Sequence, residues 1–184
     1  FLVVCVTWLV PGLVGHDPWK ADEATSFGTV LEMLATGDWV VFRIAGEPYL
    51  ERAPLSLWIA ATFAKMLGGV LPLHDAARLA TGVFMSATLG LLGATAYELM
   101  GGRAVRMAVM LFIGCLGLLI RAHELSPDLA GLAGIALGLY GLALALRKPV
   151  VGGAVAGLGI GVAFLGNGFL NLGMLIALLM LLPL

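Results

Sequence analysis

Seven apolar runs take up most of the chain, and their lengths constrain the fold more than any other feature of the sequence. A helix needs about 20 residues, and at least about 17, to cross the roughly 30 Å hydrocarbon core of a bilayer. The middle runs reach that length, so we predict an all-α, polytopic transmembrane helix bundle. The runs are Phe1–Val14, Leu55–Leu73, Leu79–Met100, Ala104–Ile120, Leu129–Leu146, Val150–Phe169 and Leu170–Leu184.

Composition agrees with a membrane protein and excludes one class of partner. Hydrophobic residues make up 61% of the chain and charged residues 11%, against about 25% charged in soluble domains. The net charge of −1 supplies no basic field for a nucleic-acid backbone. Cys5 and Cys115 both lie in apolar runs, where small buried hydrophobes are expected rather than a disulfide or metal site.

The run Leu55–Leu73 decides the topology. Lys65 lies near its centre, and a lysine at the bilayer centre costs about 2.5–3.5 kcal/mol. If this run crossed the membrane, the basic turns at 103–106 and 147–148 would lie outside, against the positive-inside rule. We therefore expect it to lie along the interface, with residues 79–184 forming the membrane helices and residues 15–78 a long external loop. We interpret Phe1–Val14 as the end of a first membrane helix rather than a signal peptide.

Within the loop, local signals predict a helix, a short extended segment and a second helix. Asp22 to Thr36 has acidic residues at its start, an apolar stripe, and Gly37 as a stop signal. Trp39 to Ile44 is expected to be extended, with a turn at Ala45-Gly46. Pro54 suits the first turn of a helix that begins near Leu55. Glycines spaced four apart predict close helix contacts in the membrane: Gly134 and Gly138, and then Gly153, Gly157 and Gly161.

The expected topology gathers the acidic residues on one membrane face together with several cations. Such a cluster suits three tasks: ionising a hydroxyl nucleophile, holding a divalent cation through oxygen ligands, and binding an anionic leaving group. These are the needs of a transfer reaction on a phosphate-linked substrate. The acids are Asp17, Asp22, Glu23, Glu47, Glu51, Glu124 and Asp128, and the cations are Lys20, Arg43, Arg52, Arg121 and His123.

Each part of the cluster also has a purely structural interpretation. Asp22-Glu23 can serve as a helix cap, Glu51-Arg52 as a solvated loop pair, and the segment 121–128 as a polar turn before the next helix. His123 has only Glu124 and Asp128 nearby as metal ligands, which is a weak basis for a zinc site.

A series of motifs resembles the GT-C membrane glycosyltransferases, in the group of the protein O-mannosyltransferases and the bacterial aminoarabinose transferase that modifies lipid A. The resemblance runs from Asp22 to about Gly168 and rests on the order and spacing of its parts. They are Asp22-Glu23-Ala24, then residues 32–39 (EMLATGDW), residues 46–55 (GEPYLERAPL), Trp58, Gly68, Arg78-Leu79 and Asp128.

The resemblance implies a GT-C fold and an inverting transfer from a polyprenyl-phosphate sugar to a lipid, glycan or protein acceptor. It implies a multi-pass protein of a bacterial-type inner membrane with an extracytoplasmic site, surrounded by membrane lipids and using no nucleic acid. The family's catalytic positions fall on Asp22, with Glu23 beside it, and on Asp128. Substrate binding is assigned to Glu51, Arg52, Tyr49, Arg121 and His123, and a possible divalent cation to Glu51 and Asp128.

Three departures from the family pattern concern charge. Thr25-Ser26 stand where the family often has Arg-Tyr, Arg52 replaces a lysine, and Leu165-Gly166-Asn167-Gly168-Phe169 replaces Leu-Thr-Lys-Gly-Pro. Arg52 can still bind a phosphate, in bidentate fashion. We interpret residues 1–184 as the N-terminal membrane module of a glycosyltransferase and expect this fragment alone to be inactive. The alternative is a non-catalytic membrane protein, either a transporter-like bundle or a scaffold that binds lipid-linked sugars.

Overall fold

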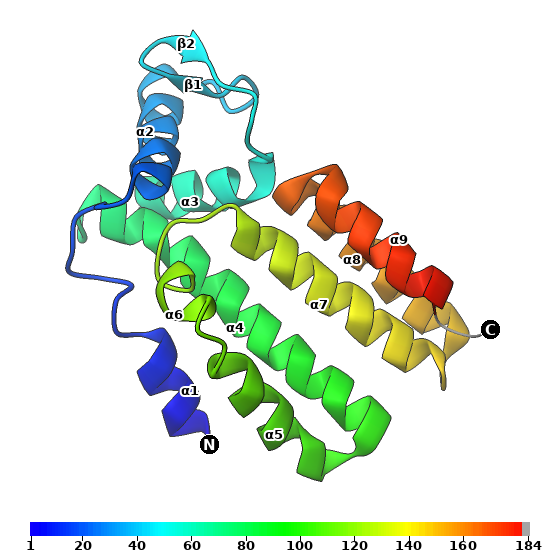
Figure 1. Ribbon diagram of the computed structural model, residues 1–184. Coiled ribbons are helices and arrows are strands. Elements are labelled where there is room, and N and C mark those ends of the chain that lie inside the picture. Colours follow the sequence, from blue (N-terminus) through cyan, green and yellow to red (C-terminus); the bar gives the residue numbers. More distant parts are fainter. Residues whose placement is uncertain (182–184) are drawn as a thin grey trace.

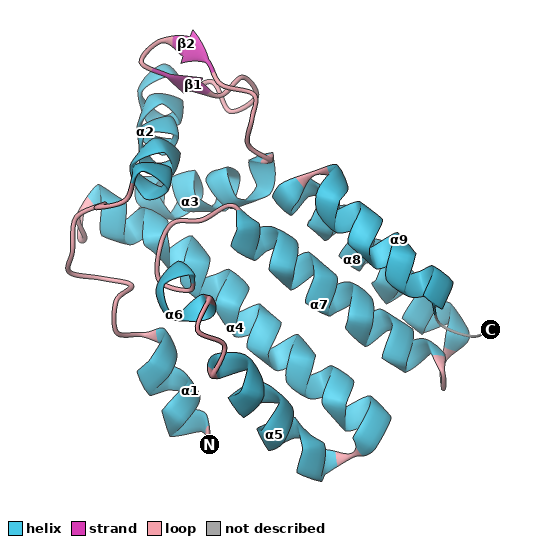
Figure 2. Cartoon of the chain, in the orientation of Figure 1, coloured by secondary structure: helices cyan, strands magenta, loops and turns pink. Residues whose placement is uncertain are grey.

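The computed structural model describes residues 1–181, and within them the chain is helical apart from one two-stranded hairpin (Figures 1 and 2). The predicted all-α fold is therefore confirmed. The elements are α1 (Leu2–Leu9), α2 (Ala21–Thr36), β1 (Arg43–Ile44), β2 (Glu47–Pro48), α3 (Pro54–Leu67), α4 (Leu73–Met100), α5 (Gly102–Ile113), α6 (Leu118–Arg121), α7 (Asp128–Ala145), α8 (Pro149–Asn167) and α9 (Phe169–Leu181).

Among the described residues, three helices are long and apolar enough to cross a membrane: α4, α7 and α8. They lie side by side in sequence order, with α4 against α7 and α7 against α8 (Figure 1). The predicted span Leu79–Met100 is longer than expected, because α4 begins at Leu73, directly after Pro72. The polar residues His74, Asp75 and Arg78 therefore belong to the first turns of α4 and not to the external loop.

The predicted span Ala104–Ile120 is wrong as a single helix. Helix α5 ends at Ile113 and a separate short helix, α6, begins at Leu118. Between them the Cys115 N–H donates to the Phe112 carbonyl, three residues back, which tightens the last turn. The 12 residues of α5 rise about 18 Å, too little to cross the hydrocarbon core. Gly114 and Gly117 flank this break.

The glycine prediction for the membrane helices is half right. A side chain at Gly134 would meet the backbone of Ala163, so this close contact is confirmed, and Gly138 lies against Gly159. Gly153, Gly157 and Gly161 have nothing within 4 Å of the position that a Cβ would take. The glycines of α8 that touch α7 are instead spaced seven apart: Gly152, Gly159 and Gly166. Two helices packed at a small angle repeat their contacts every seven residues.

The turns and helix ends of the external loop lie where the sequence predicts them, whereas the extended segment predicted for Trp39 to Ile44 is confirmed only at Arg43–Ile44, which form β1. Gly37 ends α2 in the left-handed conformation, with φ of 73°. Ala45 and Gly46 both have positive φ, as the tight turn of a two-residue hairpin requires, and they connect strands that pair Ile44 with Glu47. Pro54 begins α3. The Trp58 indole N–H donates to the Trp39 carbonyl at 2.7 Å, which fixes the hairpin segment against α3.

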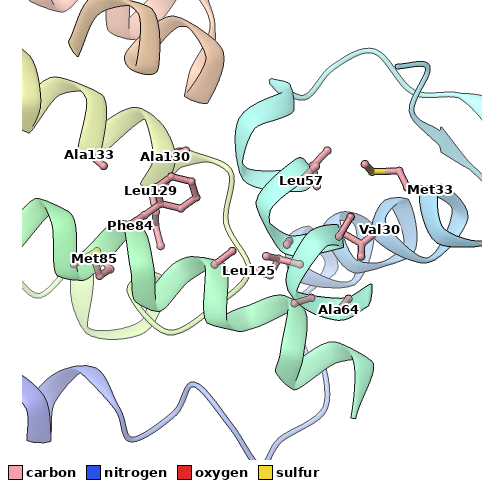
Figure 3. Packing of buried hydrophobic residues seen from close by; sticks show 14 of the residues in the cluster. Val30, Met33, Leu57, Ala64, Phe84, Met85, Leu125, Leu129, Ala130 and Ala133 are labelled. Atoms are coloured by element: carbon pink, nitrogen blue, oxygen red, sulfur yellow. The ribbon is translucent and has the colours of Figure 1, made fainter. Parts of the chain in front are cut away.

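Helix α3 is an apolar helix of 14 residues, too short to span. It lies across the end of α4 in Figure 1, at a steep angle to the membrane-spanning helices. Its buried face, which includes Leu57 and Ala64, packs between α2 and the bundle (Figure 3). Lys65 is exposed. The length and direction of α3 agree with an interfacial helix, while the side of the membrane on which it lies stays a prediction.

The turn after α2 carries a testable pH dependence. The N–H groups of Val41 and Val40 donate to Asp38 Oδ1 at 3.1 and 3.0 Å. These two bonds hold the pKa of Asp38 below its usual value. A carboxyl whose pKa is lower in the folded state stabilises that state above its unfolded pKa, and the effect is lost as pH falls through the folded value. NMR titration of the Asp38 carboxyl carbon should therefore give a midpoint below that of an unstructured peptide, and equal midpoints would contradict the two bonds.

Candidate functional site

Arg78, in the first turns of α4, is the centre of a buried charge network. Its Nε donates to Glu23 Oε1 at 2.8 Å, and its Nη1 donates to Asp75 Oδ1 at 3.0 Å. Arg78, Glu23 and Asp75 are 1%, 2% and 3% exposed. Charges so deeply buried are stable only when opposite charges and hydrogen bonds replace water.

The same three residues connect segments that are far apart in sequence. Arg78 Nη1 also donates to the His16 carbonyl at 3.0 Å, and the Gly15 N–H donates to both carboxylate oxygens of Asp75. Glu23 Oε1 accepts from the N–H of Leu125, 102 residues away. Three segments therefore meet at the N-terminal end of α4. They are the start of the external loop, the start of α2 and the connection at residues 122–127.

A second ion pair, closer to the surface, joins the residue before α2 to the 122–127 connection. Lys20 Nζ lies 2.7 Å from Glu124 Oε1, and the side chain of Glu124 is only 8% exposed. The expected gathering of the two acidic segments on one side of the bundle is thus confirmed for Glu23 and Glu124. The side of the membrane on which this face lies stays a prediction.

Asp22 differs from its neighbour Glu23 because it faces outward. Its side chain is 66% exposed and Oδ1 accepts from Arg52 Nη2 at 3.0 Å. Arg52 Nε donates to the Tyr49 hydroxyl at 3.4 Å. Burial alone would lower the pKa of Arg52, but the Tyr49 and Asp22 contacts outweigh it, and the net effect raises that pKa. Three of the predicted site residues, Asp22, Tyr49 and Arg52, therefore form one hydrogen-bonded group.

Arg52 also lines a groove of about 360 Å³ between the loop before α3 and the junction of α8 and α9. One wall contains residues 50–54, and the other contains Phe164, Leu165, Asn167, Gly168 and Phe169. Gly168 ends α8 with φ of 65°. The groove brings together two motifs that lie more than 100 residues apart in the sequence, 51–54 and 165–169. Glu51 is exposed at its edge.

Three other predicted residues, Arg121, His123 and Asp128, have partners other than Arg52. Arg121 Nη1 pairs with Asp128 Oδ2 at 2.8 Å, and both side chains are about half exposed. His123 places its ring nitrogens against two backbone carbonyls, those of Trp8 at 2.7 Å and Leu119 at 3.0 Å, so it fastens α1 to α6. Among the described residues, no ion pair or side-chain hydrogen bond joins Asp128 to Glu51 or to the Asp22–Arg52 pair.

The possible divalent cation gains no support from this arrangement. Residues 1–181 contain no group of three or more His, Cys, Asp or Glu side chains placed to hold a metal ion. Of the two predicted ligands, Asp128 is already paired with Arg121. The divalent cation therefore stays a prediction from the sequence, and no step proposed below uses one.

Arg78 and Asp75 were not predicted as site residues. Their spacing of three places them on one helix face, which the sequence does show. Their burial against Glu23 depends on the way α4 meets α2, and that contact has no local signal. Arg78 was named only as part of the Arg78-Leu79 motif, and no role was predicted for Asp75.

The fold described above is similar to that of a solved protein structure. The crystal structure of ArnT from Cupriavidus metallidurans in the apo state superposes with a TM-score of 0.83 over 98% of this chain and 34% of that chain, at 22% identity. The chain therefore shares the GT-C type of fold with the part of ArnT that it matches. No model of a protein family matches it.

One protein with a similar sequence also bears the name of an aminoarabinose transferase. The undecaprenyl phosphate-alpha-4-amino-4-deoxy-L-arabinose arabinosyl transferase 1 of Sodalis glossinidius (strain morsitans) is 29% identical over 175 residues, which cover 91% of this chain. The chain spans about a third of the length of both proteins, 30% of the transferase and 34% of ArnT. The predicted resemblance to GT-C enzymes of the aminoarabinose transferase group is thus confirmed for the ArnT-like part described here.

Proposed function

We propose that this chain is part of a membrane glycosyltransferase that moves a sugar from a polyprenyl-phosphate donor to a hydroxyl or phosphate of a lipid, glycan or protein acceptor. One observation carries the proposal: Arg52, paired with Asp22, lines a groove whose other wall is the α8–α9 junction. The ArnT-like fold and the printed name of the Sodalis relative support a sugar carried on undecaprenyl phosphate. By that analogy, lipid A is the first acceptor to test.

In the proposed reaction, Asp22 acts on the acceptor and Arg52 acts on the leaving group. The bond from the sugar's anomeric carbon to the donor phosphate oxygen breaks while a bond to the acceptor oxygen forms. Asp22 takes the proton of the acceptor O–H, whether this belongs to an alcohol or to a phosphate monoester, and the Arg52 guanidinium neutralises the charge that stays on the departing phosphate. Arrival of the donor phosphate would compete with Asp22 for Arg52, which would free the Asp22 carboxylate to act as a base.

The remaining predicted residues are proposed to bind or position the substrates or to hold the site together. Glu51 and Tyr49 lie next to Arg52 and are proposed to orient the sugar and the phosphate. Glu23, which is buried against Arg78, is proposed to fix the position of Asp22 rather than to touch substrate. The Arg121–Asp128 pair is proposed to contact the acceptor, and His123 to hold α1 in place.

Replacing Asp22 with asparagine tests the proposal. In the full-length protein, Asp22→Asn should reduce transfer from undecaprenyl-phosphate aminoarabinose to lipid A by about 10²–10⁴-fold, because the neutral amide cannot take the proton. Glu47→Gln serves as the matched control, since Glu47 is an exposed acid of the same loop. Membrane insertion and thermal stability of both variants should equal those of the wild type. An Asp22→Asn enzyme with wild-type turnover would remove Asp22 from the mechanism.

A further inference from the structure

The start of α2 is fastened to the 122–127 connection at two points. Lys20, the residue before α2, places its Nζ 2.7 Å from Glu124 Oε1. Three residues further along the chain, Glu23 Oε1 accepts from the Leu125 N–H at 3.2 Å. Both carboxylates belong to buried residues. Two neighbouring residues of one segment therefore hold two nearby residues of the other, and this fixes the two segments relative to each other.

The 122–127 connection is in turn anchored to the helix bundle. The hydroxyl of Thr81, in α4, donates to the backbone carbonyl of Glu124 at 2.7 Å, and Thr81 is buried. Glu124 thus contacts α4 through its backbone and the residue before α2 through its side chain. It links the start of α2 to a helix that is long enough to span the membrane.

Residues with proposed roles in the reaction lie on both sides of this link. Asp22, the proposed base, follows Lys20 by two residues, and its short side chain keeps the carboxylate close to the backbone. On the other side, Arg121 and Asp128 flank the 122–127 connection and pair with each other at 2.8 Å. The separation between the proposed base and the proposed acceptor contact therefore depends on how this link holds the start of α2.

We propose that Glu124 is a positioning residue for the transfer reaction. Through Lys20 it holds the Asp22 carboxylate at the distance from the acceptor O–H that proton removal requires, and it touches no reacting atom itself. This inference rests on the proposed function. A general base must lie within about 2.6–3.2 Å of the oxygen whose proton it takes, and a misplacement of about 1 Å can lower a rate by about 10²-fold.

Replacing Glu124 with glutamine in the full-length protein tests this role. Glutamine has nearly the same shape but lacks the charge that holds Lys20, whose side chain is 34% exposed and can then be solvated. With undecaprenyl-phosphate aminoarabinose and lipid A as substrates, kcat should fall by roughly 10–100-fold. The KM for the donor should stay within about twofold of the wild type, because the groove beside Arg52 is unchanged. The double variant K20M/E124Q leaves neither charge unpaired, and it should show the same loss.

The matched control is Glu98→Gln, which removes an ion pair near the other end of α4. Glu98 Oε2 lies 3.5 Å from Arg147 Nη1, and the Glu98 side chain is 17% exposed. This variant should keep the kcat of the wild type, because Glu98 has no contact with the start of α2 among residues 1–181. An equal loss of kcat in Glu98→Gln and Glu124→Gln would overturn the inference.

A double-mutant cycle with Asp22→Asn separates positioning from a general loss of structure. If Glu124 acts through Asp22, Glu124→Gln should lower the residual rate of the Asp22→Asn protein by less than about twofold, because no base is left to position. A purely structural role would lower the rates of both proteins by the same factor and would contradict the inference.

The same cycle distinguishes failure of this inference from failure of the proposed function. Wild-type turnover in Asp22→Asn would remove the proposed base, and the positioning role would fall with it. A large loss in Asp22→Asn together with wild-type kcat in both Glu124→Gln and K20M/E124Q would leave the proposed function intact and refute the role of Glu124 alone.

Discussion

Replacing Arg78 with methionine is expected to destabilise the protein by about 3–5 kcal/mol, the cost of removing one partner from a buried ion pair. Methionine fills much of the same volume, but it leaves the carboxylates of Glu23 and Asp75 buried without their cation. The His16 carbonyl also loses its donor. Thermal unfolding of the purified full-length protein in detergent should show a clearly lower midpoint than the wild type.

The matched control for this prediction is Lys65→Met. Lys65 is exposed on α3, and no ion pair or side-chain hydrogen bond to it is found among residues 1–181. Its replacement should change stability by less than about 0.5 kcal/mol. Arg78→Lys should fall between the two, because an ammonium keeps the charge but lacks the planar fork that reaches Glu23 and Asp75 together. Equal midpoints for Arg78→Met and Lys65→Met would show that the buried network contributes nothing net to stability.

The parts of the external loop that could be predicted are those with strong local signals. Gly37, the Ala45-Gly46 turn and Pro54 restrict the backbone by themselves, so the ends of α2 and the beginning of α3 follow from the sequence. The apolar runs likewise predict α7 and α8 to within a residue or two. These signals do not need any knowledge of what the segment packs against.

The missed features all depend on contacts between segments. Hydropathy does not distinguish a continuous span from α5 followed by a break, because both are equally apolar. The division of Asp22 from Glu23, one exposed and one buried, depends on where Arg78 of α4 lies. Arg52 and Asn167 line the same groove because the α8–α9 junction reaches the loop before α3, and no spacing within the chain indicates that arrangement.

The choice of contact glycines in α8 leads to a second prediction with a large effect. A Cβ at Gly159 would meet the backbone of Gly138 on α7, whereas one at Gly157 would meet nothing within 4 Å. Backbone cannot yield as a side chain does, so Gly159→Ala should force the two helices apart and cost about 1–3 kcal/mol. Gly157→Ala should be neutral or slightly stabilising, since alanine in a helix is favoured over glycine by about 1 kcal/mol.

Thermal unfolding of the two alanine variants in the same detergent distinguishes these contacts from the spacing of four read in the sequence. The seven-residue spacing of Gly152, Gly159 and Gly166 predicts that each is sensitive to alanine. Gly153, Gly157 and Gly161 should all tolerate it, because their Cβ positions open away from α7. A variant at Gly157 as unstable as the one at Gly159 would place the α7–α8 contact on the other face of α8. Since the α8–α9 junction forms one wall of the Arg52 groove, a rotation of α8 would also remove Asn167 from that groove.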